Sequence, residues 1–199
     1  MHLRAPAIVL AARAHGETAV IARLLTAEHG VVAGYVAGGR GRNLRPVVIP
    51  GNLVEAEVRA RSDSQLPFAR LELVRSRGPW LAEPLPAAAI AWVCALTASA
   101  LPERNPYPAL HAALGGLLDA ICTAPSARGW VPALASYEVL MLRELGYGGN
   151  RPAIAGLAEA MSLLDRIGPA IQRHLLGDAR ADIYAARTLL RERLQRIGG

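Results

Sequence analysis

The residues with the clearest chemical character are the arginines of a glycine-rich stretch at positions 37–46, which reads Ala-Gly-Gly-Arg-Gly-Arg-Asn-Leu-Arg-Pro. Arg40, Arg42 and Arg45 place three guanidinium groups within six residues. The three glycines among them leave the backbone free to approach another molecule closely. Such a loop is suited to a chain of phosphates, so the pattern favours binding of a polyanion.

Motifs for catalysis or for metal binding are missing. All 22 basic residues are arginine, which excludes a P-loop lysine and a Schiff-base lysine. Cys94 and Cys122 are too far apart for a zinc half-site and too few for a disulfide scaffold. The five histidines are scattered and show no metal-ligand spacing: His2, His15, His29, His111 and His174. We therefore expect a protein that is not an enzyme and that has no cofactor.

The positive charge is concentrated in the first part of the chain. The formal net charge is +6 over 199 residues. Residues 1–80 hold 11 arginines against 6 acidic residues, whereas residues 81–199 hold 11 against 10. A biased composition explains arginine in place of lysine, but it explains this asymmetry less readily. We expect the first part to contact the polyanion.

Hydrophobic residues make up 52% of the chain, but no apolar run reaches the length of a membrane-spanning helix. The opening residues 1–15 imitate a short secretory signal, although Pro6 interrupts their apolar part. We expect a reduced, cytoplasmic protein with no membrane partner.

In the first part of the chain, alternating apolar and polar residues predict short strands with one apolar face. Alternation is clearest from Leu53 to Arg61, where Val54, Ala56 and Val58 point one way and charged residues point the other. Residues 46–50 are expected to be short and extended. The five predicted strands cover residues 7–13, 18–26, 31–37, 53–61 and 68–75. They suit a small barrel of the OB type, and an SH3-like barrel would give much the same pattern.

Helical spacing begins after residues 78–80. Helices are predicted near residues 90–101, 110–121, 130–145, 157–175 with a break at Gly168 and Pro169, and 182–197. Arg187 and Arg191 are predicted to share an exposed face of the last helix. The fold class is thus α+β: an N-terminal five-stranded OB-type β-barrel, residues 1–78, followed by an all-α helical domain, residues 79–199.

Two groups of arginines are candidate binding residues. In the barrel, a nucleic-acid surface is predicted from Arg40, Arg42, Arg45, Arg23, Arg59 and Arg61. Stacking residues are few in this part, only Tyr35, Phe68 and Trp80, so we expect phosphate contacts to dominate, with weak sequence preference and strong salt dependence. In the helical domain, a basic-rimmed groove for an acidic, apolar peptide is predicted from Arg104, Arg128 and Arg143, although ordinary surface arginines would look the same.

The order and spacing of several short motifs add a resemblance to a known family. They are Ala7-Ile8-Val9-Leu10, His15-Gly16-Glu17, Leu24-Leu25-Thr26, His29-Gly30, Ala37-Gly38-Gly39-Arg40 and Pro50-Gly51-Asn52-Leu53-Val54-Glu55. Over residues 5–75 the chain resembles the amino-terminal domain of the RecO family of bacterial DNA repair and recombination mediators.

The resemblance implies an OB domain that binds single- and double-stranded DNA and anneals complementary strands. It further implies partners: RecR, the acidic tail of the single-stranded DNA-binding protein, and indirectly the RecA recombinase. Some family members carry a four-cysteine zinc site, but residues 145–150 hold no cysteine here, so no metal is expected. Two alternatives remain open from the residues themselves: a protein-interaction module that binds no DNA, and an RNA-binding OB protein.

Overall fold

The structure is a computed structural model that describes residues 2–60, 65–148, 152–177 and 181–198. The chain divides into two compact units. The barrel unit consists of Met1–Glu83 with Leu101–Pro108, and the helical unit consists of Pro84–Ala100 with Ala109–Gly199. Each unit is described by itself.

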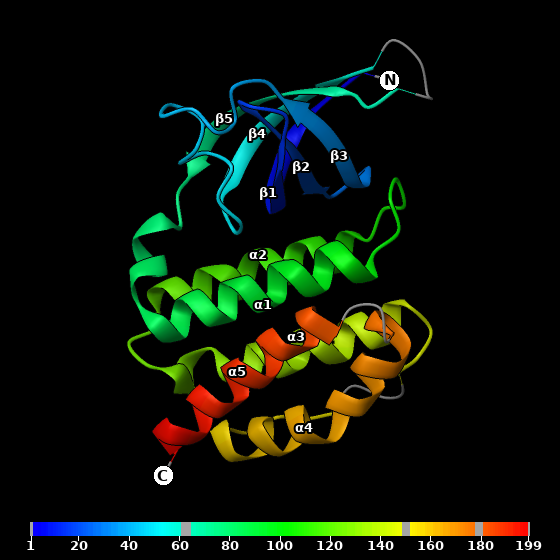
Figure 1. The fold of residues 1–199 in the computed structure, drawn as a ribbon. Helices are drawn as coiled ribbons and strands as arrows, with labels where there is room; N and C mark the ends of the chain where they lie inside the picture. The colour runs from blue at the N-terminus through cyan, green and yellow to red at the C-terminus, as the bar shows by residue number, and fades with distance from the viewer. Residues whose placement is uncertain (1, 61–64, 149–151, 178–180, 199) are drawn as a thin grey trace. The chain divides into compact units, whose positions relative to one another are not determined.

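Five strands form the barrel unit (Figure 1). They are β1 (His2–His15), β2 (Ala19–Thr26), β3 (Gly30–Val36), β4 (Leu53–Arg59) and β5 (Phe68–Arg75). Their order around the closed barrel is β1-β2-β3-β5-β4. Every neighbouring pair is antiparallel except β3 and β5, which run parallel and meet where Tyr35 lies opposite Phe68. The predicted five-stranded α+β fold is confirmed, and the strand order is that of an OB fold.

Alternating side chains build the barrel core. In β4, Val54, Ala56 and Val58 are buried, while the residues between them point outward. β1 supplies Ala7 and Val9 to the same core. This strand pairs with β4 through its first half and with β2 through its second half, and a bulge lies where it changes neighbours.

Two local predictions in the barrel are wrong. β1 begins at His2 rather than at residue 7, because pairing with β4 continues through Pro6. Residues 46–50 are not extended but follow tight turns, in which the amides of Val47 and Val48 both donate to the Leu44 carbonyl, at 2.9 and 3.1 Å. Both valines are buried in the barrel core, so their burial holds the turn in place.

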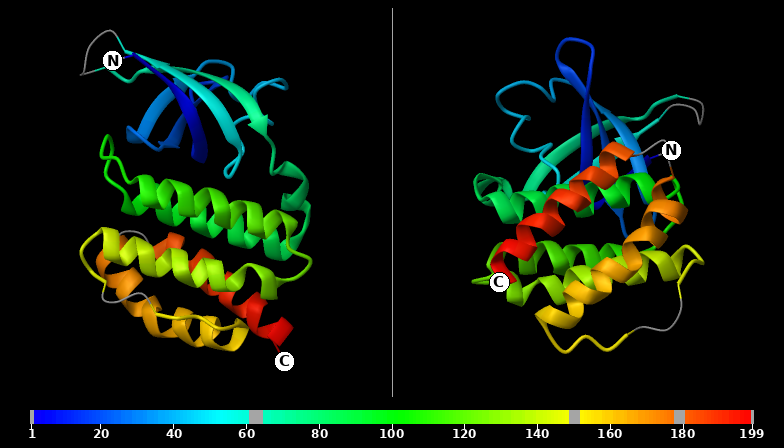
Figure 2. Two further views of the ribbon diagram at one scale, coloured as in Figure 1. Left: turned by 180° about the vertical axis from the view of Figure 1, so that it is seen from behind. Right: turned by 60° about the horizontal axis from the view of Figure 1, so that its bottom comes forward.

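The helical unit holds α1 (Pro84–Ala100), α2 (Pro108–Thr123), α3 (Val131–Glu144), α4 (Leu157–Ala170) and α5 (Ala181–Gly198), shown in Figures 1 and 2. The short helices are η1 (Gly78–Ala82), η2 (Ala127–Gly129) and η3 (Ile171–Leu176). The predicted break at Gly168 and Pro169 is wrong. α4 passes through both residues, and the wider π-type turn of η3 follows directly. In the described part of the chain no helix is long and apolar enough to cross a membrane.

A buried ion pair joins four of these helices, and it corrects a further prediction. Arg187 of α5 is buried rather than exposed, and Arg191 is only 7% exposed. The Arg187 guanidinium donates to the Glu138 carboxylate of α3 at 2.7 Å and to the Leu164 carbonyl at 2.6 Å. Trp92 of α1 donates to the same carboxylate at 2.7 Å. Sequence periodicity cannot distinguish this arrangement from a solvated face, because the partners lie on distant segments.

Candidate nucleic-acid interface

The arginine loop connects β3 to β4 and is braced at both ends. At its start the Gly39 amide donates to the Val36 carbonyl at 3.2 Å, and Gly39 itself is buried against Val20. A Cβ atom at residue 39 would lie 2.6 Å from a Val20 methyl, so only glycine fits without a shift. At its end, the Asn52 side chain donates to the Pro46 carbonyl at 2.8 Å. The loop therefore has a defined course over the barrel surface.

Arg40 connects this loop to the β1–β2 turn through hydrogen bonds. Its guanidinium donates to the Gly16 and Glu17 carbonyls at 3.3 and 3.0 Å, and its amide donates to the Thr18 carbonyl at 2.9 Å. Figure 2 shows the loop beside that turn at one end of the barrel. Both acceptors of the guanidinium are neutral carbonyls, so the positive charge of the exposed Arg40 side chain is not cancelled by a carboxylate there.

Arg42 and Arg45 are the two loop arginines whose side chains stay unpaired among the described residues. Both are exposed, and within the described residues neither guanidinium has a hydrogen bond or an ion pair. The loop's backbone turns are closed by the Arg45 amide, which donates to the Gly41 carbonyl at 2.9 Å. The structure thus brings Arg40, Arg42 and Arg45 together on an exposed loop, with charges available to a ligand.

The other predicted barrel arginines differ in their surroundings. Arg23 pairs with Glu103 at 2.6 Å, so much of its charge is offset inside the unit. Arg59 pairs with Glu57, and the hydrogen bonds from Arg59 and His2 lower the pKa of the Glu57 carboxyl. Arg61 lies outside the described residues.

A groove of about 600 Å³ lies next to the arginine loop. Its lining comes from β3, β4, β5 and the loop, and includes Tyr35, Leu44, Arg59, Phe68 and Arg70. Phe68 is 66% exposed although it is a large apolar ring. Sequence reasoning counted Tyr35 and Phe68 among the few aromatic residues but did not place them together, because the register of β3 against β5 is not readable from the chain.

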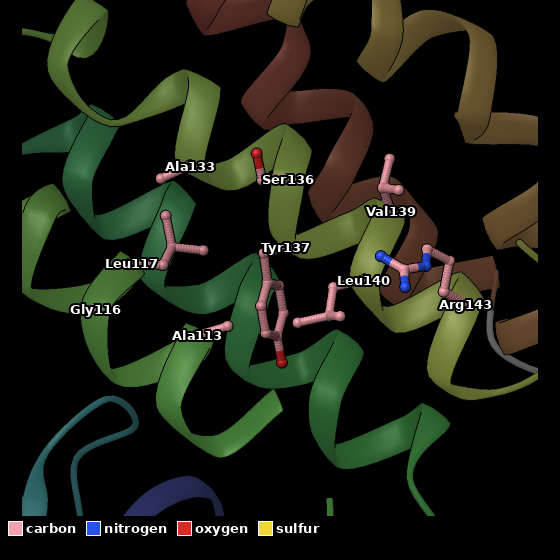
Figure 3. A pocket seen from close by; sticks show the side chains of 9 residues that line it. All are labelled: Ala113, Gly116, Leu117, Ala133, Ser136, Tyr137, Val139, Leu140 and Arg143. Atoms are coloured by element: carbon pink, nitrogen blue, oxygen red, sulfur yellow. The ribbon is translucent and has the colours of Figure 1, made fainter. Parts of the chain in front are cut away.

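The helical unit has a groove of about 380 Å³ between α2 and α3. Its lining is largely apolar, with Leu117, Val139 and Leu140, and Arg143 lies at one end (Figure 3). Of the three arginines predicted for a peptide groove, Arg143 alone lines it. Arg128 is exposed in η2, and Arg104 belongs to the segment that is part of the barrel unit.

The fold and the arginine loop define a class of protein in which an OB-type barrel is joined to an all-α unit. A family model described as "Recombination protein O N terminal" matches residues 1–77, and one described as "Recombination protein O C terminal" matches residues 83–150. The chain belongs to the RecO family. Its role therefore falls within DNA repair and recombination, and the resemblance seen in the sequence is confirmed.

Curated relatives carry the name DNA repair protein RecO. The protein of Phenylobacterium zucineum is 38% identical over 178 residues, which cover 87% of this chain and 72% of that relative. The protein of Gluconacetobacter diazotrophicus is 36% identical, over 90% of this chain and 73% of its own length. The protein of Rhodospirillum centenum is 47% identical over 143 residues, which span 71% of this chain and 56% of that relative.

Proposed function

We propose that the barrel unit binds single- and double-stranded DNA without sequence preference, through the arginines of the β3–β4 loop. The observation that carries this proposal is the exposed, braced loop with Arg40, Arg42 and Arg45, of which the last two have no partner among the described residues. A loop whose backbone is already held in place loses less conformational entropy on binding than a loose loop does. Arg23 and Arg59 contribute less, since carboxylates already offset their charge.

The proposed action is non-covalent. Arginines that neutralise phosphates on two strands lower the repulsion between the strands, and this favours annealing of complementary sequences. Within the RecO family's role in repair, the protein would bring this activity to strands coated by the single-stranded DNA-binding protein, together with RecR, and so help the RecA recombinase to load. No bond is made or broken in any of these steps.

A triple variant tests the loop. Replacing Arg40, Arg42 and Arg45 by alanine should weaken binding to single-stranded DNA roughly 10- to 100-fold at physiological salt, because about three phosphate contacts are lost. The logarithmic salt slope, expected to be about −2 to −3.5 in the unaltered protein, should become shallower by about 2. Binding is measured by fluorescence anisotropy over a range of salt concentrations, and annealing with complementary oligonucleotides.

A matched control removes the same charge from the helical unit, at the exposed residues Arg166, Arg173 and Arg196. This variant should retain both the affinity and the slope. Equal losses in the two variants would contradict the proposal, since net charge alone would then explain binding. Unchanged DNA binding with loss of a protein partner would favour a protein-interaction module, and tighter binding of RNA than DNA in competition would favour an RNA-binding protein.

A second function is favoured by the groove between α2 and α3. We propose that it accepts an acidic, apolar peptide such as the tail of the single-stranded DNA-binding protein. Leu117, Val139 and Leu140 offer apolar contacts, and the exposed Arg143 offers a charge for a carboxylate. Gly116 also lines the groove, and the space that its Cβ would occupy is open to 4 Å. The groove therefore has room for side chains of a partner.

A further inference from the structure

One row of side chains crosses the outer face of the barrel from strand to strand. In the strand registers, Arg13 of β1 lies opposite Ile21 of β2, and Ile21 lies opposite Tyr35 of β3. Tyr35 lies opposite Phe68 of β5, and Phe68 lies opposite Arg59 of β4. Directly paired residues project from the same face of a sheet. The row therefore runs from one arginine, across three apolar residues, to another arginine.

The aromatic residues of this row contact one another. The rings of Tyr35 and Phe68 meet edge to face, with centroids 5.3 Å apart, and His15 meets Tyr35 in the same way at 5.8 Å. The partly exposed Tyr35 keeps its ring oriented through two neighbours, while Phe68 leaves most of its surface in water. Two neighbouring rings, one of them mostly exposed, offer an apolar surface from which a ligand could displace water with a gain in free energy.

Charge indicates what kind of ligand covers these rings. The row ends at Arg13 and Arg59, and Arg70 and the β3–β4 loop line the same groove as Tyr35 and Phe68. Glu57 is the acidic residue in the groove lining, and its carboxylate already accepts hydrogen bonds from Arg59. Aromatic rings bordered by arginines match a strand that carries flat bases on an anionic backbone.

We propose that Tyr35 and Phe68 form a stacking ledge for the bases of single-stranded nucleic acid, while the neighbouring arginines hold its phosphates. The inference rests on the proposed DNA binding and adds a distinction that phosphate contacts alone do not give. Bases in a duplex are stacked on one another and are not free to cover an aromatic side chain, so the ledge favours single strands over duplex. Stacking tolerates any base, in keeping with weak sequence preference.

The test distinguishes contacts to the bases from contacts to the phosphates of the nucleic acid. Binding is measured to an oligothymidine and to an abasic strand of the same length, whose phosphates are retained but whose bases are absent. Phe68→Ala should lower affinity for the oligothymidine roughly 5- to 150-fold and leave the abasic strand and the salt slope unchanged. Phe68→Leu, which keeps an apolar side chain, should give a similar loss because the flat ring is absent. Tyr35→Leu should act in the same direction.

Val74→Ala is the matched control, since Val74 is an exposed apolar residue at the far end of the same strand, 59% exposed. It should bind both strands as the unaltered protein does. Equal losses on the two strands, or no loss in Phe68→Ala, would overturn the ledge while leaving the proposed DNA binding in place. Failure of the unaltered protein to bind either strand would overturn both.

Discussion

Removing the Arg187 guanidinium should destabilise the helical unit severely. The Glu138 carboxylate, 1% exposed, accepts hydrogen bonds from Trp92 and from Arg187, each at 2.7 Å. Burial alone would lower the pKa of Arg187, but the adjacent Glu138 carboxylate raises it above the ordinary value, so the guanidinium keeps its charge. Arg187→Met would leave the buried Glu138 carboxylate with Trp92 as its side-chain donor among the described residues, and the hydrogen bond from Arg187 to the Leu164 carbonyl would be lost.

The expected cost is about 3 to 5 kcal/mol, the range for breaking one side of a buried ion pair. That is a large part of the roughly 5 to 15 kcal/mol by which domains are stable. The loss is measured by urea unfolding followed by circular dichroism. The midpoint urea concentration should fall, while the dependence of the unfolding free energy on urea concentration should not change. Adding Glu138→Gln should recover part of the loss, because the amide oxygen still accepts from Trp92 and the buried charge is gone.

The control on the same helix is Arg196→Ala, an exposed position that should change stability by less than about 0.5 kcal/mol. The reasoning would be refuted if Arg187→Met cost less than about 1 kcal/mol. It would also be refuted if the losses from Arg187→Met and Glu138→Gln simply added in the double variant, since two directly paired groups must show coupling.

Two further predictions concern the helical unit. In the α2–α3 groove, Arg143→Ala should weaken binding of an acidic, apolar peptide by loss of charge, and Gly116→Leu should weaken it by filling the open space. Binding is measured by fluorescence anisotropy, and Arg173→Ala is the control that should not change the affinity. Equal affinities in all variants would argue against the groove. Burial lowers the pKa of the half-buried His111, so as the pH falls the unfolded state takes up a proton before the folded state does. The free energy of unfolding should therefore decrease below about pH 6.5, by at most about 1.4 kcal/mol per pH unit. His111→Leu should flatten that decrease in urea midpoints, and an unchanged pH dependence would contradict it.

Much of the barrel could be predicted because its strands have one face in the core. Val54, Ala56 and Val58 alternate with charged residues and are buried as expected. The turn around Val47 and Val48 was missed because two adjacent apolar residues carry no periodicity, and their burial depends on the rest of the barrel. The arginine loop was visible in the sequence because its residue types are unusual in themselves.

What could not be predicted depends on pairing between distant segments. The charge of Arg23 is offset by Glu103, which lies 80 positions away in the chain. Arg187 looked like a surface residue because its partner lies in another helix, and a buried charge becomes possible only when that partner is present. The row from Arg13 to Arg59 likewise needs four strand registers, none of which a single strand specifies.

The barrel is closed by a short pairing between β3 and β5, and the stacking ledge of Tyr35 and Phe68 lies on this pairing. β3 and β5 are joined where Tyr35 lies opposite Phe68, and the Tyr35 amide donates to the Pro67 carbonyl at 2.7 Å. Beside it, Gly34 faces Ala69 so closely that a Cβ at residue 34 would lie 2.6 Å from the alanine Cβ. The register of β3 against β5 is the shortest in the barrel, so we expect local opening to begin there. A single strand of nucleic acid whose bases stack on both Tyr35 and Phe68 would bridge β3 and β5. Binding at the stacking ledge would therefore stabilise the closed barrel, and a stably closed barrel would favour binding.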